Sequence, residues 1–412
     1  MKIFNQSRKK NKWLLLLLFF LPSCTEDFII PSIPLDLDPV TLANPISLAV
    51  SPQNQRLYVV NSNGRVQWYD SSFIVFDISD PTNPQPMDVI RIKNFSGQII
   101  LDEARQYVYI PNRKGDEDND ADTSEQVLRI NINEASSDFL KVEEVVSAEN
   151  PFGAFFDGQN LYVAATGEAL RYDVDNMTGY SSVDLEVKTN EDRDLDADET
   201  REIAVSPSGS HIFVTNRVDN MLVLDAQEFL EPTPPGVRAL GSEAVDYIVV
   251  GTVSTRGITR DSKYIYMIDG TPAVLKVMTD EGLDPVVGAP KEISAASLQV
   301  ASIPVGVEPG QIIVDEAKQR AYVTNVESND LSIVDLVLQQ EVGRIDLSTR
   351  PAGVKDEDWD GDQPFGLAML EENGKQYLYV AHYDTNLISV IDLEQQSVVK
   401  IIGELPKAED YQ

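Results

Sequence analysis

The stretch 321-AYVTNVESNDLSIVD-335 decides the fold. Its two apolar runs, Ala321 to Thr324 and Leu331 to Asp335, are rich in β-branched and aromatic residues and are separated by a short polar turn. This is the pattern of two antiparallel strands. The same Tyr-Val type of pair recurs six more times, at Tyr58, Tyr109, Tyr162, Phe213, Tyr266 and Tyr379. The seven aromatic positions are separated by 51, 53, 51, 53, 56 and 57 residues, a spacing even enough to predict a structural repeat.

Each repeat has the same internal order. A strand of small residues opens it (203–205 is an example), and a turn and the Tyr-Val strand follow. A third strand tends to end in Asp, as at Asp335, and a fourth closes the unit, as in 398–402. Four strands per unit without helical periodicity predict an all-β fold, a seven-bladed β-propeller over residues 45–403. Because each sheet needs neighbours on both faces, we expect one cooperative domain. Residues 29–37 either reinforce the edge of the last blade or belong to a tether.

Three of the repeats resemble the YVTN β-propeller repeat. They contain Tyr322-Val323-Thr324-Asn325, Phe213-Val214-Thr215-Asn216 and Tyr379-Val380-Ala381-His382, where His382 departs from the usual Asn. The other four copies are degenerate, and the resemblance covers about residues 44–403. It implies the fold but leaves the function open, because the family includes surface-layer proteins, exported proteins and relatives of lactonases.

The N-terminus predicts export and lipidation. A basic stretch precedes the apolar run Trp13 to Leu21, which at about nine residues is too short to span a membrane and is typical of a signal peptide. Leu21-Pro22-Ser23-Cys24 resembles a bacterial lipobox, and Cys24 is the only cysteine. Lipidation explains a lone cysteine in an exported protein; an incidental cysteine is the alternative. We therefore expect a signal peptide (1–23), a lipidated Pro-rich tether (24–44), the propeller and a C-terminal tail (404–412).

The charge of the chain restricts its partners. Losing the five basic residues of the leader takes the formal net charge from −34 to −39. Such a surface repels nucleic acid and anionic lipid and attracts cations, so no nucleic-acid partner is expected. Thr25-Glu26-Asp27 resembles the acidic export signal of Bacteroidetes surface lipoproteins, and a generic acidic spacer is the alternative. The expected location is the bacterial cell envelope, as an outer-membrane lipoprotein facing the periplasm or the cell surface, held to the membrane by its N-terminal lipid.

Three segments of the form D-x-D-x-D-x-D predict metal sites. Their aspartates are Asp116, Asp118, Asp120, Asp122, Asp192, Asp194, Asp196, Asp198, Asp356, Asp358, Asp360 and Asp362. Alternating carboxylates can surround Ca²⁺, which takes about 6–8 oxygen ligands. The twelfth position, where an EF-hand has a bidentate Glu, is Val127, Ile203 or Leu367, so we expect isolated sites of lower affinity. Solvated acidic turns are the alternative.

Topology should bring these segments together. In a four-stranded blade, the loops between strands two and three and the loops between blades emerge on one face, where all three acidic segments are expected. The candidate ligand-binding residues near the mouth of the central funnel on this face are Arg113, Arg201, Arg256 and His382. Local ion pairs are the alternative role for the arginines, and a polar strand end in place of Asn is the alternative for His382.

The sequence favours binding over catalysis. His211 and His382 are the only histidines, and no G-x-S-x-G, C-x-x-C-H or phosphate-binding glycine loop is present. We assign no catalytic residue and expect a cation-ordered binding or scaffolding module for a protein or glycan. The first alternative is a cation-dependent lactonase-type hydrolase with its site in the central funnel, which needs no histidine; a purely structural envelope component is the second.

Overall fold

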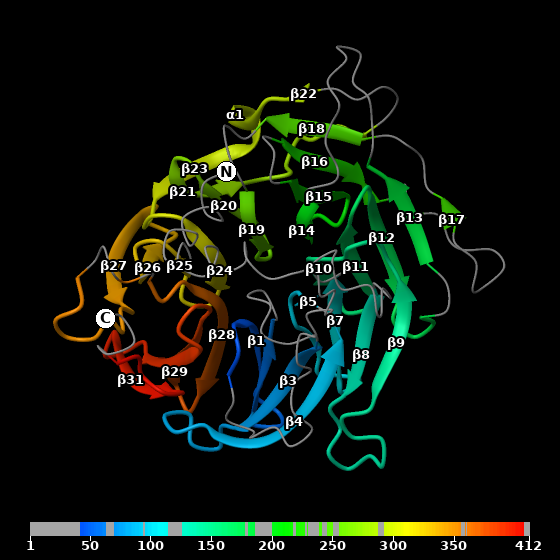
Figure 1. The fold of residues 1–412 in the computed structure, drawn as a ribbon. Coiled ribbons are helices and arrows are strands. Elements are labelled where there is room, and N and C mark those ends of the chain that lie inside the picture. Colours follow the sequence, from blue (N-terminus) through cyan, green and yellow to red (C-terminus); the bar gives the residue numbers. More distant parts are fainter. Residues whose placement is uncertain are drawn as a thin grey trace, which may run out of the picture.

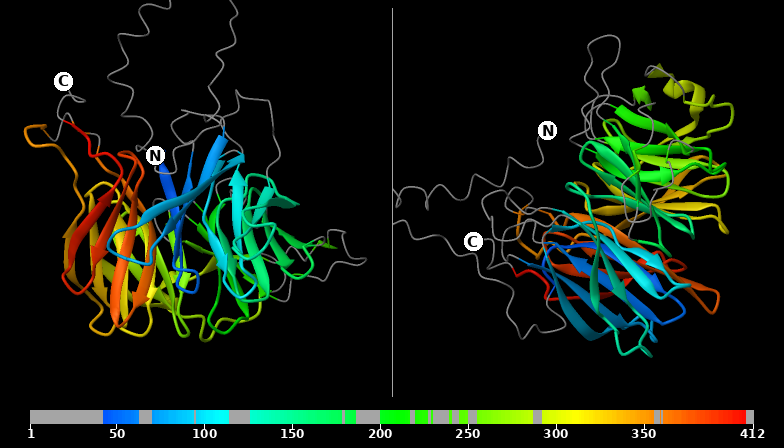
Figure 2. Two further views of the ribbon diagram at one scale, coloured as in Figure 1. Left: turned by 90° about the horizontal axis from the view of Figure 1, so that it is seen from below. Right: turned by 90° about the vertical axis from the view of Figure 1, so that its right-hand side faces the viewer.

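Seven sheets, each built on four antiparallel strands, stand radially around a central channel in the computed structural model (Figure 1). The side views in Figure 2 show the strands of each sheet running between the two ends of this ring. The structure describes residues 42–62, 70–93, 95–113, 126–177, 180–185, 200–216, 220–226, 229, 239–240, 245–249, 255–286, 292–355, 359 and 361–407. The predicted fold, seven blades of four strands, is confirmed.

Blades 1 and 2 follow each other directly. Blade 1 consists, from the channel outward, of β1 (Pro45–Ser51), β2 (Arg56–Asn61), β3 (Asp70–Asp77) and β4 (Gln85–Lys93). In blade 2 the innermost strand is broken into two pieces. The strands are β5 (Phe95–Ser96), β6 (Ile100–Asp102), β7 (Tyr107–Arg113), β8 (Gln126–Asn131) and β9 (Val142–Ser147).

Blades 3 and 4 each carry a fifth, parallel strand on the outer edge, which the sequence did not predict. Blade 3 contains β10 (Ala154–Phe156), β11 (Asn160–Ala165), β12 (Glu168–Asp173), β13 (Tyr180–Asp184) and the added β17 (Ala239–Leu240). Blade 4 contains β14 (Thr200–Val205), β15 (His211–Asn216), β16 (Asn220–Asp225), β18 (Val245–Val249) and the added β22 (Glu292–Ile293).

Blades 5 to 7 complete the ring. Blade 5 contains β19 (Thr255–Arg260), β20 (Ile265–Gly270), β21 (Ala273–Met278) and β23 (Gln299–Pro304), with the short helix α1 (Ala295–Leu298) before β23. Blade 6 contains β24 (Pro309–Asp315), β25 (Arg320–Asn325), β26 (Asp330–Asp335) and β27 (Gln340–Asp346). Blade 7 contains β28 (Pro364–Glu372), β29 (Lys375–His382), β30 (Leu387–Asp392) and β31 (Ser397–Ile402). In the described residues, no helix has the length and apolar character needed to cross a membrane.

The core consists of seven apolar clusters, each shared by two neighbouring blades. The aromatic residue of every repeat contributes to the cluster between its own blade and the next one. Tyr58 packs toward blade 2 in this way, whereas its neighbours Leu57 and Val59 pack toward blade 7. Alternate side chains of one strand therefore serve two interfaces, because they point to opposite faces of the sheet.

The ring closes between blades 7 and 1, where β1 lies beside β28 (Figure 1). Asn44, just before β1, donates its amide to Asn386 Oδ1 at 2.6 Å and its side-chain nitrogen to the Tyr383 carbonyl at 2.8 Å. Its own carbonyl accepts the Ser62 amide at 2.8 Å. Blade 7 supplies all four of its described strands, and residues 29–37 lie outside the described residues. Side-chain packing and Asn44 therefore join the ends of the described ring.

The outer strands differ according to whether another strand covers them. In β4, β9, β23, β27 and β31 the register skips one apolar residue, respectively Met87, Val145, Val300, Val342 and Val399. The register of β13 and β18 is regular, and these are the edges on which β17 and β22 pair. A bulge interrupts the row of backbone groups that another strand would need. The bulged edges are thus protected against strand addition, and the regular ones are covered by the chain itself.

Shortening Leu57 tests whether the ring unfolds as one unit. Leu57 is fully buried between blades 7 and 1, so Leu57→Ala should lower the free energy of unfolding by about 2–5 kcal/mol. Urea denaturation followed by fluorescence should show a single unfolding transition for the variant, with its midpoint at a lower urea concentration. Val337→Ala, at a side chain that is 71% exposed, is the control and should change stability by less than about 0.5 kcal/mol. A separate early transition in the Leu57 variant would contradict a single cooperative domain.

Candidate functional site

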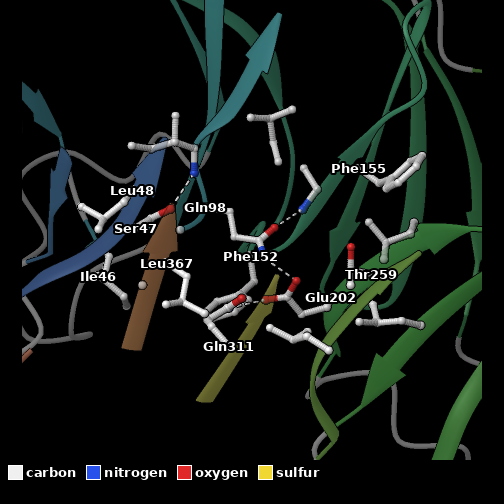
Figure 3. Close-up of a pocket in the computed structure, with 18 of the residues that line it drawn as sticks. Ile46, Ser47, Leu48, Gln98, Phe152, Phe155, Glu202, Thr259, Gln311 and Leu367 are labelled. Atoms are coloured by element: carbon white, nitrogen blue, oxygen red, sulfur yellow. Dashed lines mark hydrogen bonds between the residues drawn. The ribbon is translucent and has the colours of Figure 1, made fainter. Parts of the chain in front are cut away.

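The innermost strands of five blades, β1, β14, β19, β24 and β28, are irregular at the same place. In β14, Thr200 pairs with Asn216 and Ile203 with Val214, so Arg201 and Glu202 together face one residue of β15. Such a bulge turns a side chain away from the regular alternation of a strand. At this level the Glu202 side chain points into the central channel (Figure 3).

Aligning the blades on their strand register gives one equivalent residue per blade at the Glu202 level. From blade 1 to blade 7 these residues are Ser47, Gln98, Gly153, Glu202, Gly257, Gln311 and Gly366. Two of the glycines are required by the approach of the next inner strand. A Cβ on Gly153 would lie 2.4 Å from the Arg201 carbonyl oxygen, and one on Gly366 would lie 2.6 Å from that of Ile46. Polar side chains therefore enter the channel from blades 1, 2, 4 and 6.

The four polar residues and Gly366 line a cavity of about 330 Å³, to which residues in or next to the inner strands of all seven blades contribute. Its wall contains the apolar side chains of Phe152, Phe155, Ile258 and Phe365, but polar groups make up more of the surface that faces the cavity. Among the described lining residues, Glu202 is the one with an ionisable side chain. The site therefore combines apolar and polar groups around a single acid among the described lining residues.

Glu202 is held by two carboxamides that reach it from other blades (Figure 3). Gln98 Nε2 donates to Glu202 Oε2, and Gln311 Nε2 donates to Oε1 at 3.2 Å. Gln98 Oε1 also accepts the Ala154 amide at 3.3 Å. Glu202 itself is only 2% exposed. The network thus crosses the channel and joins blades 2, 3, 4 and 6.

Burial governs the ionisation of this acid. It raises the pKa of the Glu202 carboxyl from an ordinary value of 4.5 to about 7, although the hydrogen bonds from Gln311 and Gln98 and the charge of Arg201 act in the opposite direction. A carboxyl with a pKa near 7 can take up or release a proton close to neutrality. Glu202 can therefore exchange a proton or neutralise a cation in the channel.

The threonines of the two complete Val-Thr-Asn repeats support the bulges. Thr215 Oγ1 accepts the Glu202 amide at 2.9 Å, and Thr324 Oγ1 accepts the Gln311 amide at 3.0 Å. Thr324 also donates to the Phe365 carbonyl of the next blade at 3.0 Å. A bulge removes an amide from the strand ladder, and the hydroxyl supplies the missing partner. The repeat threonine thus positions the channel residue.

His382 lies inside blade 7. Its side chain is fully buried, and its Nε2 is 2.8 Å from Ser389 Oγ. The asparagines at the equivalent position make the same contact: Asn61 Nδ2 donates to Ser72 Oγ at 2.8 Å, and Asn325 Nδ2 donates to Ser332 Oγ at 2.9 Å. His382 therefore occupies the place of a structural hydrogen bond between two strands and does not line the channel cavity.

Of the twelve aspartates in the three acidic segments, Asp362 is the one that the structure describes, and its side chain is buried. Its carboxylate accepts the Thr349 amide at 2.6 Å and the Thr385 hydroxyl at 2.8 Å, and Thr349 Oγ1 donates to it as well. Burial alone would raise the pKa of this carboxyl, but His382, whose Nδ1 is 3.8 Å away, and Thr349 outweigh burial and lower it. In this structure Asp362 joins the segment between blades 6 and 7 to blade 7. The other eleven aspartates of the acidic segments lie outside the described residues.

Of the three arginines predicted to bind a ligand, the structure describes the side chain of one. The guanidinium carbon of Arg201 lies 5.0 Å from the ring centre of Phe152, a residue of the cavity wall. Arg113 lies in β7 and Arg256 in β19, and their side chains are outside the described part, as is all of Cys24. Of the predicted ligand-binding residues, Arg201 is thus the one that the structure places next to the channel cavity.

The strand ends that flank the acidic segments lie at one end of the propeller. Asn112 of β7 pairs with both Ser96, in the inner strand of blade 2, and Gln126, which follows the first segment. The second and third segments precede Thr200 and Pro364, which begin inner strands at the same end. The Glu202 level of the channel is near this end as well.

Sequence analysis missed Gln98, Glu202 and Gln311. A signal existed, because Gln98, Glu202 and Gln311 each stand eleven residues before the aromatic residue of their repeat. The three glycines stand nine or thirteen residues before theirs, and only the strand register makes them equivalent. That their side chains meet follows only from the circular arrangement, since they are more than 100 residues apart.

The comparisons with known proteins agree on the fold. No protein-family model and no curated protein sequence matches the chain. Among solved structures, the chain is similar to the β-propeller domain of Cps50 (Swd1) from Myceliophteria thermophila, with a TM-score of 0.53, 10% identity and coverage of 86% of this chain and 96% of that one. It is also similar to the hydrazine synthase of Kuenenia stuttgartiensis, with a TM-score of 0.54, 15% identity and coverage of 90% and 99%. At these identities the likeness shows the fold alone.

The raised pKa of Glu202 predicts a pH-dependent stability. Between pH 4.5 and 7 the native state binds more protons than the unfolded state, so stability should fall as pH rises through this window, by up to about 3 kcal/mol. Glu202→Gln keeps the size and polarity of the side chain but cannot ionise. Urea denaturation at pH 5, 6, 7 and 8 should therefore show that the free energy of unfolding of the variant increases relative to that of the wild type as pH rises. A constant difference between the two proteins would mean that Glu202 titrates normally.

Proposed function

We propose that this protein is a diverged YVTN-type propeller, exported as a bacterial lipoprotein, whose propeller serves as a binding or scaffolding module for a protein or glycan. The fold itself is consistent with a binding or scaffolding module. The observation that carries the proposal is that the strand ends flanking the acidic segments lie at the same end of the ring. Loops distant in the sequence can then form one composite surface there, as binding loops on a rigid scaffold do.

The acidic segments suggest how that surface is ordered. Each brings four carboxylates at alternate positions, and these repel one another unless a cation or solvent relieves the repulsion. We propose that Ca²⁺ binds there and fixes the loop conformations that the partner recognises. The formal net charge, −34 for the whole chain and −39 without the proposed leader, attracts cations to the surface and so favours this binding.

Attachment to the membrane is the other part of the proposal. The lipobox-like Leu21-Pro22-Ser23-Cys24 supports lipidation of Cys24, and the Pro-rich residues up to 44 would then separate the propeller from an outer-membrane surface. The first propeller strand begins at Pro45, about twenty residues after that cysteine. A tether of this length leaves the loop face accessible to a partner.

One observation favours a hydrolase as the second candidate. Glu202 is a buried carboxyl in the central channel with a pKa of about 7, a value that suits a general base. A lactonase-type reaction would use such an acid in the funnel. Gln98 and Gln311 each donate a hydrogen bond to this carboxylate, and these bonds lower its basicity, which favours holding a ligand over accepting a proton from water.

Calcium titration and partner capture test the proposal together. Ca²⁺ added to the lipidated protein in calorimetry should release or absorb heat and raise the melting temperature. The triple variant Asp356→Asn, Asp358→Asn, Asp360→Asn should lose part of that heat, whereas Glu316→Gln, outside the acidic segments, should keep it. Immobilised protein should retain an envelope protein or glycan in Ca²⁺ and release it in chelator. Absence of both effects contradicts the binding proposal, and turnover of a lactone panel that Glu202→Gln abolishes would favour the hydrolase.

A further inference from the structure

The channel cavity contains a buried acid, Glu202, and the groups around it compensate only part of its negative charge. Glu202 receives two neutral donors, from Gln98 and Gln311, but these lower its pKa less than burial raises it. Arg201, on the same strand, is the charged group that acts on it, and its effect is the smallest of the four. Its guanidinium lies over Phe152 and donates to the Thr200 carbonyl at 3.4 Å. Above neutral pH the chamber therefore holds a negative charge that a cation in the cavity would stabilise.

The size and walls of the cavity favour an organic cation over a bare metal ion. About 330 Å³ corresponds to roughly ten water molecules of liquid volume, which suits a ligand of several heavy atoms. Phe152, Phe155 and Ile258 supply apolar contact for a hydrocarbon part. Ca²⁺ requires about 6–8 oxygen ligands, whereas Ser47 Oγ and Gln98 Oε1, two of the polar atoms here, already accept backbone amides.

Glu202 retains capacity for a further donor. Each of its carboxylate oxygens accepts one side-chain hydrogen bond, from Gln98 or Gln311, and a carboxylate oxygen can accept two. The two carboxamides fix the plane of the carboxylate, so its remaining acceptor positions are already oriented. A site organised in this way loses little side-chain entropy when a ligand binds.

We infer that the channel cavity binds a small primary alkylammonium, with its charged nitrogen against Glu202 and its hydrocarbon part against Phe152, Phe155 and Ile258. This site lies inside the ring, apart from the partner surface proposed above, and does not depend on it. The ammonium group can donate three hydrogen bonds, and its positive charge compensates the buried carboxylate.

Calorimetry with n-butylammonium, 1-butanol and butyrate tests the inference on the full-length protein. At pH 8, butylammonium should bind with one-to-one stoichiometry and at least roughly tenfold more tightly than butanol, and butyrate should not bind. Affinity should fall roughly tenfold from pH 8 to pH 6, because Glu202 is then mostly protonated. Titrations at pH 6 in two buffers of different ionisation enthalpy should show proton release on binding. Equal binding of butanol, or binding without proton release, would overturn the inference.

Glu202→Gln is the decisive variant because it keeps the size and shape of the side chain between Gln98 and Gln311 and removes its charge. It should weaken butylammonium binding at pH 8 at least roughly tenfold and abolish the proton release at pH 6. Glu316→Gln, at an exposed glutamate outside the cavity, should bind like the wild type. If Glu202→Gln does not fold, the proton release of the wild type decides the question. A calcium response that requires Glu202, without any response to butylammonium, would replace the organic cation by a metal ion.

Discussion

Every sheet in this protein buries both faces, and each face is covered by a neighbouring sheet. The seven apolar clusters lie between blades, and each contains the aromatic residue of one repeat. Burial of such a side chain contributes about 1.5–3 kcal/mol, but only while the adjacent blade is in place. The ring must therefore close for its terminal blades to be stable, and closure depends on the cluster between blades 7 and 1 and on Asn44.

Closing the ring brings seven inner strands close together, and this crowding shapes the channel. Where the next strand comes closest, only glycine fits, as at Gly153 and Gly366. At Glu202 and Gln311 a bulge directs a longer side chain into the channel, and the repeat threonine accepts the amide that the bulge displaces. The repeated Val-Thr pair thus contributes its valine to the packing between blades and its threonine to the position of a channel residue. Glu202, Gln98 and Gln311 form the polar centre that results.

At the outer edges the inner-strand crowding is absent, and the backbone groups of the last strand are exposed. Five outer strands carry a bulge with an apolar residue in it, such as Val342, and the two regular ones pair with β17 and β22. An open edge would invite another chain to pair with it, and both devices prevent this. The outer edges of the seven blades are therefore protected against pairing with another chain.

The sequence by itself determined the repeat and the number of blades, because the alternation of side chains along a strand is a local property. The Tyr-Val pairs and the Asp-ended third strands were all found where the structure has β-strands. The local pattern also aligned His382 with the asparagines of the other repeats, but its burial against Ser389 is seen only in the tertiary structure. The tertiary structure alone decided which polar residues meet in the channel. Gln98, Glu202 and Gln311 lie in different blades, and only the curvature of the closed ring sets the distances between them.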